Sequence, residues 1–125
     1  MMLSWKPAAE SWITINTDGS VHNPGSMAAA GGIARNQSGR NLGCFMSNYG
    51  QCPIMMAELR GALEGLILAR RLKASRVELQ LDSLAAVQVL QNQVEEGHRH
   101  APIIRQIQSL MDTFGEIKIT HIYRE

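Results

Sequence analysis

The sequence predicts an α/β domain in which helices flank a five-stranded mixed sheet. Three strand-like segments come first, at residues 12–18, 27–36 and 41–50, and turn residues separate them. Consecutive strands joined by short turns pair antiparallel, so these segments predict a meander. Strand and helix patterns then alternate along the rest of the chain, and a strand–helix–strand order favours parallel pairing.

The three N-terminal segments each carry a strand pattern. In "WITINTD", Ile13, Ile15 and Thr17 face one way, and the residues between them face the other. The turn signals "HNPGS" and "QSGR" separate this strand from "MAAAGGIARN" and "NLGCFMSNYG". Gly31 and Gly32 weaken the second strand, unless another backbone or a ligand must approach it closely.

The strongest helix pattern covers residues 54–72, which follow Pro53 and end in basic residues. Its apolar residues at helical spacing are Met55, Leu59, Ala62, Leu63, Leu66 and Ala69. The remaining predicted elements are a strand at 75–82, helices at 83–93 and 101–114, and a strand at 116–123. This order predicts that the first and fourth strands lie parallel and side by side.

Length and composition fit one ordinary globular domain, which we expect to span residues 1–125. Of the 125 residues, 45% are hydrophobic and 18% are charged, and no run approaches the roughly 20 apolar residues of a membrane span. Because the start lacks the apolar stretch of a signal peptide, we expect an intracellular protein, nuclear or cytoplasmic, with no membrane partner. Cys44 and Cys52 are expected to be free thiols. With a net charge of +1, nucleic-acid binding requires a local patch.

Three carboxylates stand in unusual places, although each has an ordinary explanation. Asp18 ends the first strand in an Asp-Gly turn pair, and Asp82 precedes a helix, where it or Ser83 can act as the N-cap. Glu58 lies on or beside the apolar stripe of its helix, either as a boundary residue whose head reaches water or as a ligand. Glu64 lies well off that stripe and is expected to be solvated.

Together, these carboxylates predict a metal site. Parallel first and fourth strands end at the same edge of a sheet, so Asp18 and Asp82 can converge there. A helix packed across the sheet can present Glu58 from its buried side. Three adjacent carboxylates repel one another unless cations lie among them, and hard divalent ions such as Mg²⁺ prefer all-oxygen ligands.

The motifs "NTDGS", "NPG", "AGGIAR", "AELRGALEGLILA" and "VELQLDSLAAVQVL", in this order, resemble the ribonuclease H family, and specifically its plant retroelement type. The resemblance covers Trp5 to Glu125 and implies a ribonuclease H-like fold with the strand order 3-2-1-4-5. It also implies that Asp18, Glu58 and Asp82 match the first three metal-binding carboxylates of the family. By the same match, the residues expected near nucleic acid are Gly19, Ser20, Asn23 and Ser83.

The activity that the resemblance implies is endonucleolytic cleavage of the RNA strand of an RNA:DNA hybrid. Two Mg²⁺ ions, for which Mn²⁺ can substitute, would activate the attacking water and stabilise the departing 3′ oxygen. The protein would recognise the shape of the hybrid and its 2′-hydroxyl groups, with little sequence specificity. The resemblance is also consistent with a reverse transcriptase domain upstream in a longer protein, and we expect a monomer.

Two departures from the family pattern bear on activity. The terminal "THIYRE" resembles the segment that leads to a fourth carboxylate, an Asp, and the sequence given stops before that residue, so we expect impaired catalysis. Residues 92–102, "NQVEEGHRHAP", are too few and too mixed in charge to match the basic protrusion of some members. The remaining candidates for phosphate contact are Arg35, Arg40 and Arg60, and we expect weak, salt-sensitive binding.

A second class of function stays open, namely a non-catalytic module that keeps this fold and binds nucleic acid or another protein. An exonuclease or junction resolvase of the same fold fits less well, because its motif spacing differs. His98, His100 and the two cysteines lack the spacing of a zinc module. No elbow motif supports a nucleophilic serine.

Overall fold

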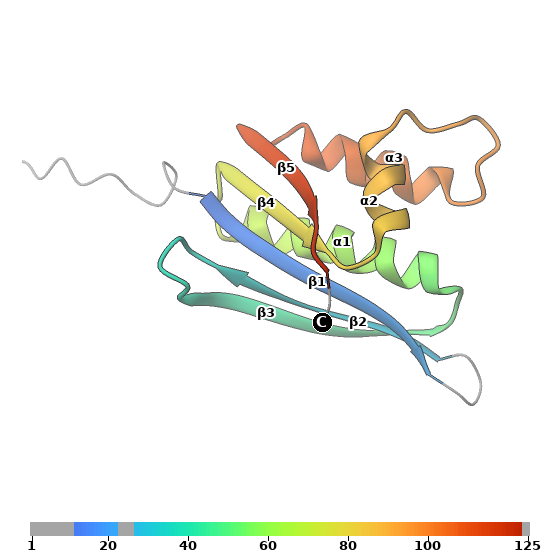
Figure 1. The fold of residues 1–125 in the computed structure, drawn as a ribbon, viewed down its shortest axis with the longest axis horizontal. Helices are drawn as coiled ribbons and strands as arrows, with labels where there is room; N and C mark the ends of the chain where they lie inside the picture. Colours follow the sequence, from blue (N-terminus) through green and yellow to red (C-terminus); the bar gives the residue numbers. More distant parts are fainter. Residues whose placement is uncertain (1–11, 23–26, 124–125) are drawn as a thin grey trace, which may run out of the picture.

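The computed structural model describes residues 12–22 and 27–123, which form a mixed five-stranded sheet with three helices (Figure 1). The strand order is β3-β2-β1-β4-β5, as predicted. The strands are β1 (Trp12–His22), β2 (Met27–Arg35), β3 (Asn41–Gln51), β4 (Arg76–Leu81) and β5 (Glu116–His121). The helices are α1 (Ile54–Arg71), α2 (Leu84–Gln91) and α3 (Ala101–Met111).

Strand β1 lies at the centre of the sheet, between an antiparallel half and a parallel half. β2 pairs antiparallel with β1 and β3, which confirms the predicted meander. β4 pairs parallel with β1 and β5. The ladder between β1 and β4 ends at the pair Thr17 and Leu81, whereas β1 continues along β2 to His22. Beyond Thr17, the described residues therefore give β1 no strand neighbour on its β4 side.

The helices pack on one face of the sheet (Figure 1). Ile13, Ile15 and Thr17 are buried on that face, as predicted. The alternate residues of β1, among them Asn16 and Asp18, point to the opposite face and are partly exposed. None of the described helices covers that second face, so polar side chains of β1 remain accessible there.

Gly32 of β2 is buried beneath an aromatic ring. A Cβ at this position would lie 2.3 Å from Cε1 of Phe45, the residue that pairs with Gly32 across β3. The close neighbour of Gly32 is therefore a side chain of the adjacent strand.

The ends of β1 and α3 differ most from the prediction. β1 runs past Asp18, which pairs with Gly31 of β2, so the Asp-Gly pair lies inside a strand and is not a turn. Pairing with β2 extends β1 through residues whose local sequence favours a turn. The third helix ends at Met111, because residues 112–114 turn toward β5. No helix among the described residues has the length and apolarity needed to cross a membrane.

Candidate metal centre

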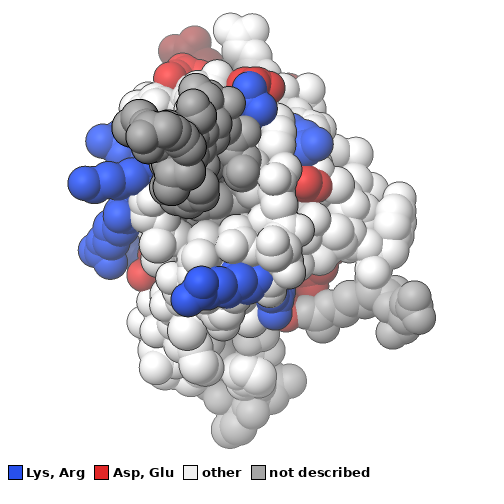
Figure 2. Space-filling model, turned by 90° about the vertical axis from the view of Figure 1, so that its left-hand side faces the viewer, with Lys and Arg blue, Asp and Glu red and all other residues white. Residues whose placement is uncertain are grey.

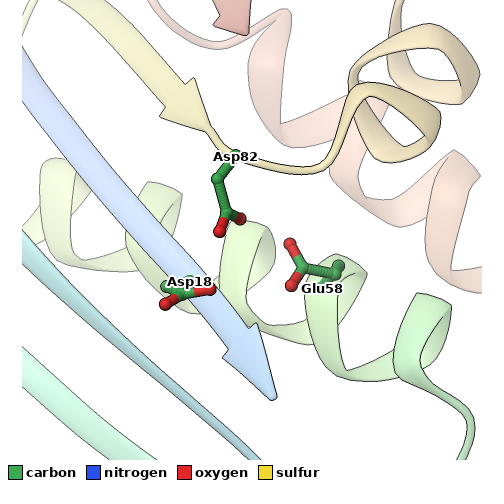
Figure 3. Close-up of side chains that lie close together, drawn as sticks. All are labelled: Asp18, Glu58 and Asp82. Atoms are coloured by element: carbon green, nitrogen blue, oxygen red, sulfur yellow. The ribbon is translucent and has the colours of Figure 1, made fainter. Parts of the chain in front are cut away.

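Asp18, Glu58 and Asp82 come together from three separate parts of the fold (Figure 3). Asp18 lies in β1, Glu58 lies in α1, and Asp82 lies in the bend between β4 and α2. One carboxylate oxygen of each residue lies within 4.8 Å of the others. Within residues 12–22 and 27–123, no second group of three or more Asp, Glu, His or Cys side chains has this geometry.

The end of the parallel ladder brings two of these carboxylates to one edge. Asp18 follows Thr17 and Asp82 follows Leu81, and these two preceding residues form the last pair between β1 and β4. After Leu81 the chain bends toward α2 instead of continuing beside β1. The two aspartates therefore converge as predicted, although Asp18 does so from within a strand.

Glu58 reaches the same edge because Gly19 has no side chain. A Cβ on Gly19 would lie 2.8 Å from both the backbone nitrogen and Oε1 of Glu58, and 2.9 Å from the carbonyl carbon of Ala57. Instead, the backbone N–H of Gly19 donates a hydrogen bond of 2.9 Å to Glu58 Oε1. Glu58 is only 5% exposed, so its head does not extend into bulk water as a boundary glutamate would.

Ser83, and not Asp82, is the N-cap of α2. Ser83 Oγ accepts a hydrogen bond of 3.1 Å from the backbone N–H of Ala86. The carboxylate of Asp82 is turned toward Asp18 and Glu58 (Figure 3). The capping role that the sequence left open for Asp82 therefore belongs to its neighbour.

The three donors fit a hard divalent cation. Carboxylate oxygens are the ligands that Mg²⁺ and Mn²⁺ prefer, and the cluster offers them from three side chains. Without a cation, negative charges this close repel one another, and the burial of Glu58 increases that repulsion. The residues that would hold the ion are therefore Asp18, Glu58 and Asp82, and this donor set suits Mg²⁺ and Mn²⁺ alike.

A groove of about 580 Å³ lies beside Asp18 on the face of the sheet without helices. The small residues Ala29 and Gly31 of β2 form part of its lining. Ser20 and His22 of β1 also line it, with 3.2 Å between Ser20 Oγ and His22 Nε2. The groove thus extends from Asp18 over an accessible surface that β1, β2 and β3 form together.

The residues predicted near nucleic acid have different surroundings. Ser20 lies in the groove, whereas Gly19 uses its backbone N–H to hold Glu58. Ser83 uses its hydroxyl to cap α2. Asn23 lies outside the described residues.

Glu64 is not the solvated residue that its position on the helix predicted. Its carboxylate accepts hydrogen bonds from Ser47 Oγ, at 2.9 Å, and from the hydroxyl of Tyr49. Both donors lie in β3, so helical periodicity alone gives no sign of them. Burial, together with the hydrogen bond to Glu64 and its negative charge, raises the pKa of Tyr49 above its ordinary value. The guanidinium carbon of Arg60 lies 5.1 Å from the centroid of the same tyrosine ring.

The other predicted phosphate contacts, Arg35 and Arg40, are exposed at the turn between β2 and β3. Figure 2 shows the end of the molecule at which β1 begins, where Lys and Arg side chains are scattered and Asp and Glu side chains lie among them. Arg76 of β4 pairs there with Glu116 of β5 at 3.1 Å. This end therefore presents mixed charge, in keeping with the net charge of +1.

Both cysteines are free, as expected, with Cys44 exposed and Cys52 partly buried. The rings of His98 and His100 lie 6.0 Å apart. Among the residues that the structure describes, neither histidine belongs to a group of three potential metal ligands.

Comparison with known families shows to which family the chain belongs. A family profile described as reverse transcriptase-like matches residues 16–125. The chain belongs to the reverse transcriptase-like family. It is a ribonuclease H-like domain of the plant retroelement type, as its motifs indicated.

One curated relative is an Arabidopsis thaliana protein whose name describes it as a ribonuclease H protein, At1g65750. The two sequences are 33% identical over 124 residues. This alignment covers 99% of the chain but only 20% of the relative, so the chain spans about a fifth of the length of that protein.

Solved structures confirm the fold. The N-terminal ribonuclease H domain of rv2228c from Mycobacterium tuberculosis has a TM-score of 0.83 at 22% identity, with 91% of this chain and 84% of that chain covered. Ribonuclease H1 of Halobacterium salinarum has a TM-score of 0.77 at 20% identity, over 90% and 86%. LC11-RNase H1 from compost, solved with an RNA/DNA hybrid, has a TM-score of 0.78 at 21% identity, over 90% and 86%.

Proposed function

We propose that this domain is a divalent-metal-dependent endonuclease of ribonuclease H type, which cleaves the RNA strand of an RNA:DNA hybrid. The observation that carries the proposal is the convergence of Asp18, Glu58 and Asp82 at the end of the parallel ladder. The reverse transcriptase-like family and the ribonuclease H name of the Arabidopsis relative support the reaction class. The hybrid bound by LC11-RNase H1 supports the substrate class.

We assign the role of holding metal to the three carboxylates. When bound, two Mg²⁺ ions, or Mn²⁺ in their place, supply an activated water and stabilise the charge on the departing 3′ oxygen. Gly19 fixes one oxygen of Glu58 through its backbone N–H, so this ligand is oriented before an ion arrives. The chain needs no side-chain nucleophile for this reaction.

We assign the path of the polynucleotide to the groove beside Asp18. Ser20 and Asn16 provide polar groups there, and Gly31 lets a backbone approach the sheet closely. Such contacts read the shape and sugars of a hybrid and not its bases, so we expect low sequence specificity. Because one chain supplies all three carboxylates, a monomer suffices for the proposed site.

The experiment is cleavage of a hybrid with a labelled RNA strand, in Mg²⁺ and separately in Mn²⁺. The wild-type chain is compared with Asp18→Asn and with Glu116→Gln, which neutralises an exposed carboxylate of β5 outside the cluster. We expect cleavage by the wild type and by Glu116→Gln, and none by Asp18→Asn. RNA without a paired DNA strand should remain intact.

A folded wild-type chain that cleaves in neither metal would overturn the nuclease proposal. In that case, hybrid binding measured by fluorescence anisotropy distinguishes the second class of function. Retained binding without cleavage would identify a non-catalytic nucleic-acid-binding module, and absence of binding would favour a protein-interaction role.

A further inference from the structure

The groove beside Asp18 has no lysine or arginine among the described residues that line it. The one acidic side chain of this lining is Asp18, and a carboxylate opposes the approach of phosphate groups. His22 is the one described residue of the lining that can carry a positive charge. A groove that accommodates a polyanion therefore depends on His22 for positive charge away from the metal centre.

His22 lies in the groove beside the hydroxyl of Ser20. Both residues alternate with Asp18 along β1, so their side chains share the face of the sheet that none of the described helices covers (Figure 1). His22 is exposed, and its Nε2 lies 3.2 Å from Ser20 Oγ. In the sequence His22 belonged to the turn signal "HNPGS", whereas pairing with the uncharged Met27 of β2 places it inside a strand. The pair is therefore accessible to a ligand in the groove.

The protonation state of His22 decides which hydrogen bonds the pair can offer. In an imidazolium both ring nitrogens carry protons, so Nε2 donates to Ser20 Oγ and the serine hydroxyl can donate elsewhere. Nδ1–H is then a second donor. In the neutral ring one nitrogen lacks a proton, and an unprotonated Nε2 accepts the hydrogen bond of the serine hydroxyl. Because phosphate oxygens only accept hydrogen bonds, the protonated pair is the form that complements a phosphodiester.

Few other titratable groups share the groove with His22. They are the carboxyl of Asp18 in β1 and the thiol of Cys44 in β3, and the residues of β2 contribute none to the lining. Histidine is the residue type whose charge ordinarily changes between pH 5 and pH 8. His22 lies four residues from Asp18, which is about 13 Å along a strand, so it acts beyond the reach of the reacting atoms. A change of its charge should therefore affect binding of the polynucleotide and not the hydrolytic step.

We propose that His22 is a substrate-binding residue, which in its protonated form binds a backbone phosphate of the hybrid together with Ser20 and makes hybrid affinity depend on pH. This role rests on the proposed function, because it assigns a ligand to the end of the groove away from the metal centre. Binding then takes up a proton. Affinity consequently falls as the pH rises, by up to about tenfold per pH unit.

The test measures binding of a labelled hybrid by fluorescence anisotropy at pH 6 and pH 8, in EDTA and at several salt concentrations. We expect the wild type to bind about 10-fold more tightly at pH 6 than at pH 8. His22→Asn should bind at both pH values as the wild type does at pH 8, and His22→Lys, which keeps a cation, should bind tightly at both. At pH 6 the slope of log affinity against log salt should be smaller by about 1 in His22→Asn than in the wild type.

His98→Gln is the matched control, because His98 lies outside the groove, in a pocket beside α2. This variant should keep the pH dependence of the wild type. Ser20→Ala retains the imidazolium and loses the hydroxyl, so it should lose part of the affinity at pH 6 and none at pH 8. Equal affinities of the wild type and His22→Asn at pH 6 would overturn the inference. So would a wild type that binds equally well at both pH values.

Cleavage assays separate this role from the proposed function. In Mg²⁺ at pH 6, His22→Asn should raise KM and leave kcat little changed. If the wild type cleaves and His22→Asn has the same KM, the role of His22 fails and the nuclease assignment stands. If the wild type cleaves in neither metal but binds with the pH dependence that His22 confers, the nuclease assignment fails and the role of His22 stands. A wild type that binds no hybrid at pH 6 would also overturn the role of His22.

Discussion

Gly19 decides how closely α1 can approach β1 beside the carboxylates. We predict that Gly19→Ala weakens both stability and metal binding, because the new Cβ would lie under 3 Å from the backbone of Ala57 and Glu58. Backbone cannot move aside as a flexible side chain can, so α1 must shift, at a cost of about 1–3 kcal/mol. Urea denaturation in EDTA measures the first effect, and calorimetric Mg²⁺ titration measures the second.

Gly31→Ala is the control for this prediction. Gly31 pairs with Asp18 across β2, but a Cβ there would come no closer than 3.5 Å to another atom, the Phe45 carbonyl oxygen. The control should fold with wild-type metal affinity. Equal losses in the two variants would show that the contact at Gly19 is not the cause.

Single residues differed in how well the sequence predicted them. The convergence of Asp18, Glu58 and Asp82 was predictable, because strand order and helical phase together restrict where each can lie. The position of Asp18 inside a strand was not predictable, since Asp-Gly favours a turn and only pairing with β2 overrides that preference. The prediction that Glu64 is solvated was wrong for a similar reason, because its partners Ser47 and Tyr49 belong to another element.

Helix α2 is short and depends on its N-cap, Ser83. We predict that Ser83→Ala destabilises the protein by about 1 kcal/mol, because Ser83 Oγ satisfies the N–H of Ala86 at the helix start. Ser83→Asn retains a capping oxygen and should recover most of the loss. Thermal unfolding in EDTA measures both variants, and an alanine variant as stable as the wild type would contradict the capping role.

The contact between β3 and α1 through Tyr49 and Glu64 predicts a loss of stability at alkaline pH. The pKa of Tyr49 is raised by burial and by Glu64, whereas an unfolded tyrosine ionises near pH 10. The folded protein therefore keeps this proton longer than the unfolded chain does. The contribution of Tyr49 to the free energy of unfolding is therefore fully present below about pH 10. It falls as the pH rises above about 10, because ionisation then favours the unfolded state.

Urea denaturation between pH 8 and pH 11.5 tests this pH dependence. Tyr49→Phe removes the ionising hydroxyl, so its free energy of unfolding should fall less steeply than that of the wild type above pH 10. Tyr123→Phe, at a residue that is 83% exposed, should keep the wild-type slope. Identical slopes in all three proteins would refute the prediction.

Element types and order were predictable because each segment has a strong period of its own. The ends of the elements were less predictable. β1 gains its last residues from pairing with β2, and α3 stops where the chain must turn into β5. The parallel placement of β4 beside β1 followed from the intervening helix. The contact between His121 Nε2 and the Asp82 carbonyl oxygen, at 3.2 Å, could not be predicted, because it depends on the register between β4 and β5.

In the absence of metal, the carboxylate cluster should lower the free energy of unfolding of the whole domain. We predict that Asp18→Asn raises the free energy of unfolding in EDTA by about 1 kcal/mol, since one of three adjacent negative charges is removed. That gain corresponds to a rise of about 4 °C in the melting temperature. Added Mg²⁺ should then stabilise the wild type more than the variant.

Differential scanning calorimetry with EDTA and with 10 mM Mg²⁺ provides the comparison for both proteins. Glu116→Gln, outside the cluster, should respond to Mg²⁺ as the wild type does. If Asp18→Asn were less stable than the wild type in EDTA, the aspartate would contribute to folding rather than oppose it.

The two halves of the sheet also differ in how far apart along the chain their partners lie. The meander from β1 to β3 joins neighbouring segments, whereas Asn16 meets Gln80 in the parallel half across 64 residues. Closing so long a loop costs more conformational entropy, and such contacts slow folding. Asp18 and Asp82 meet only when that long loop has closed. A nascent or partly unfolded chain that holds only the meander therefore lacks the assembled acidic site on which the proposed cleavage depends.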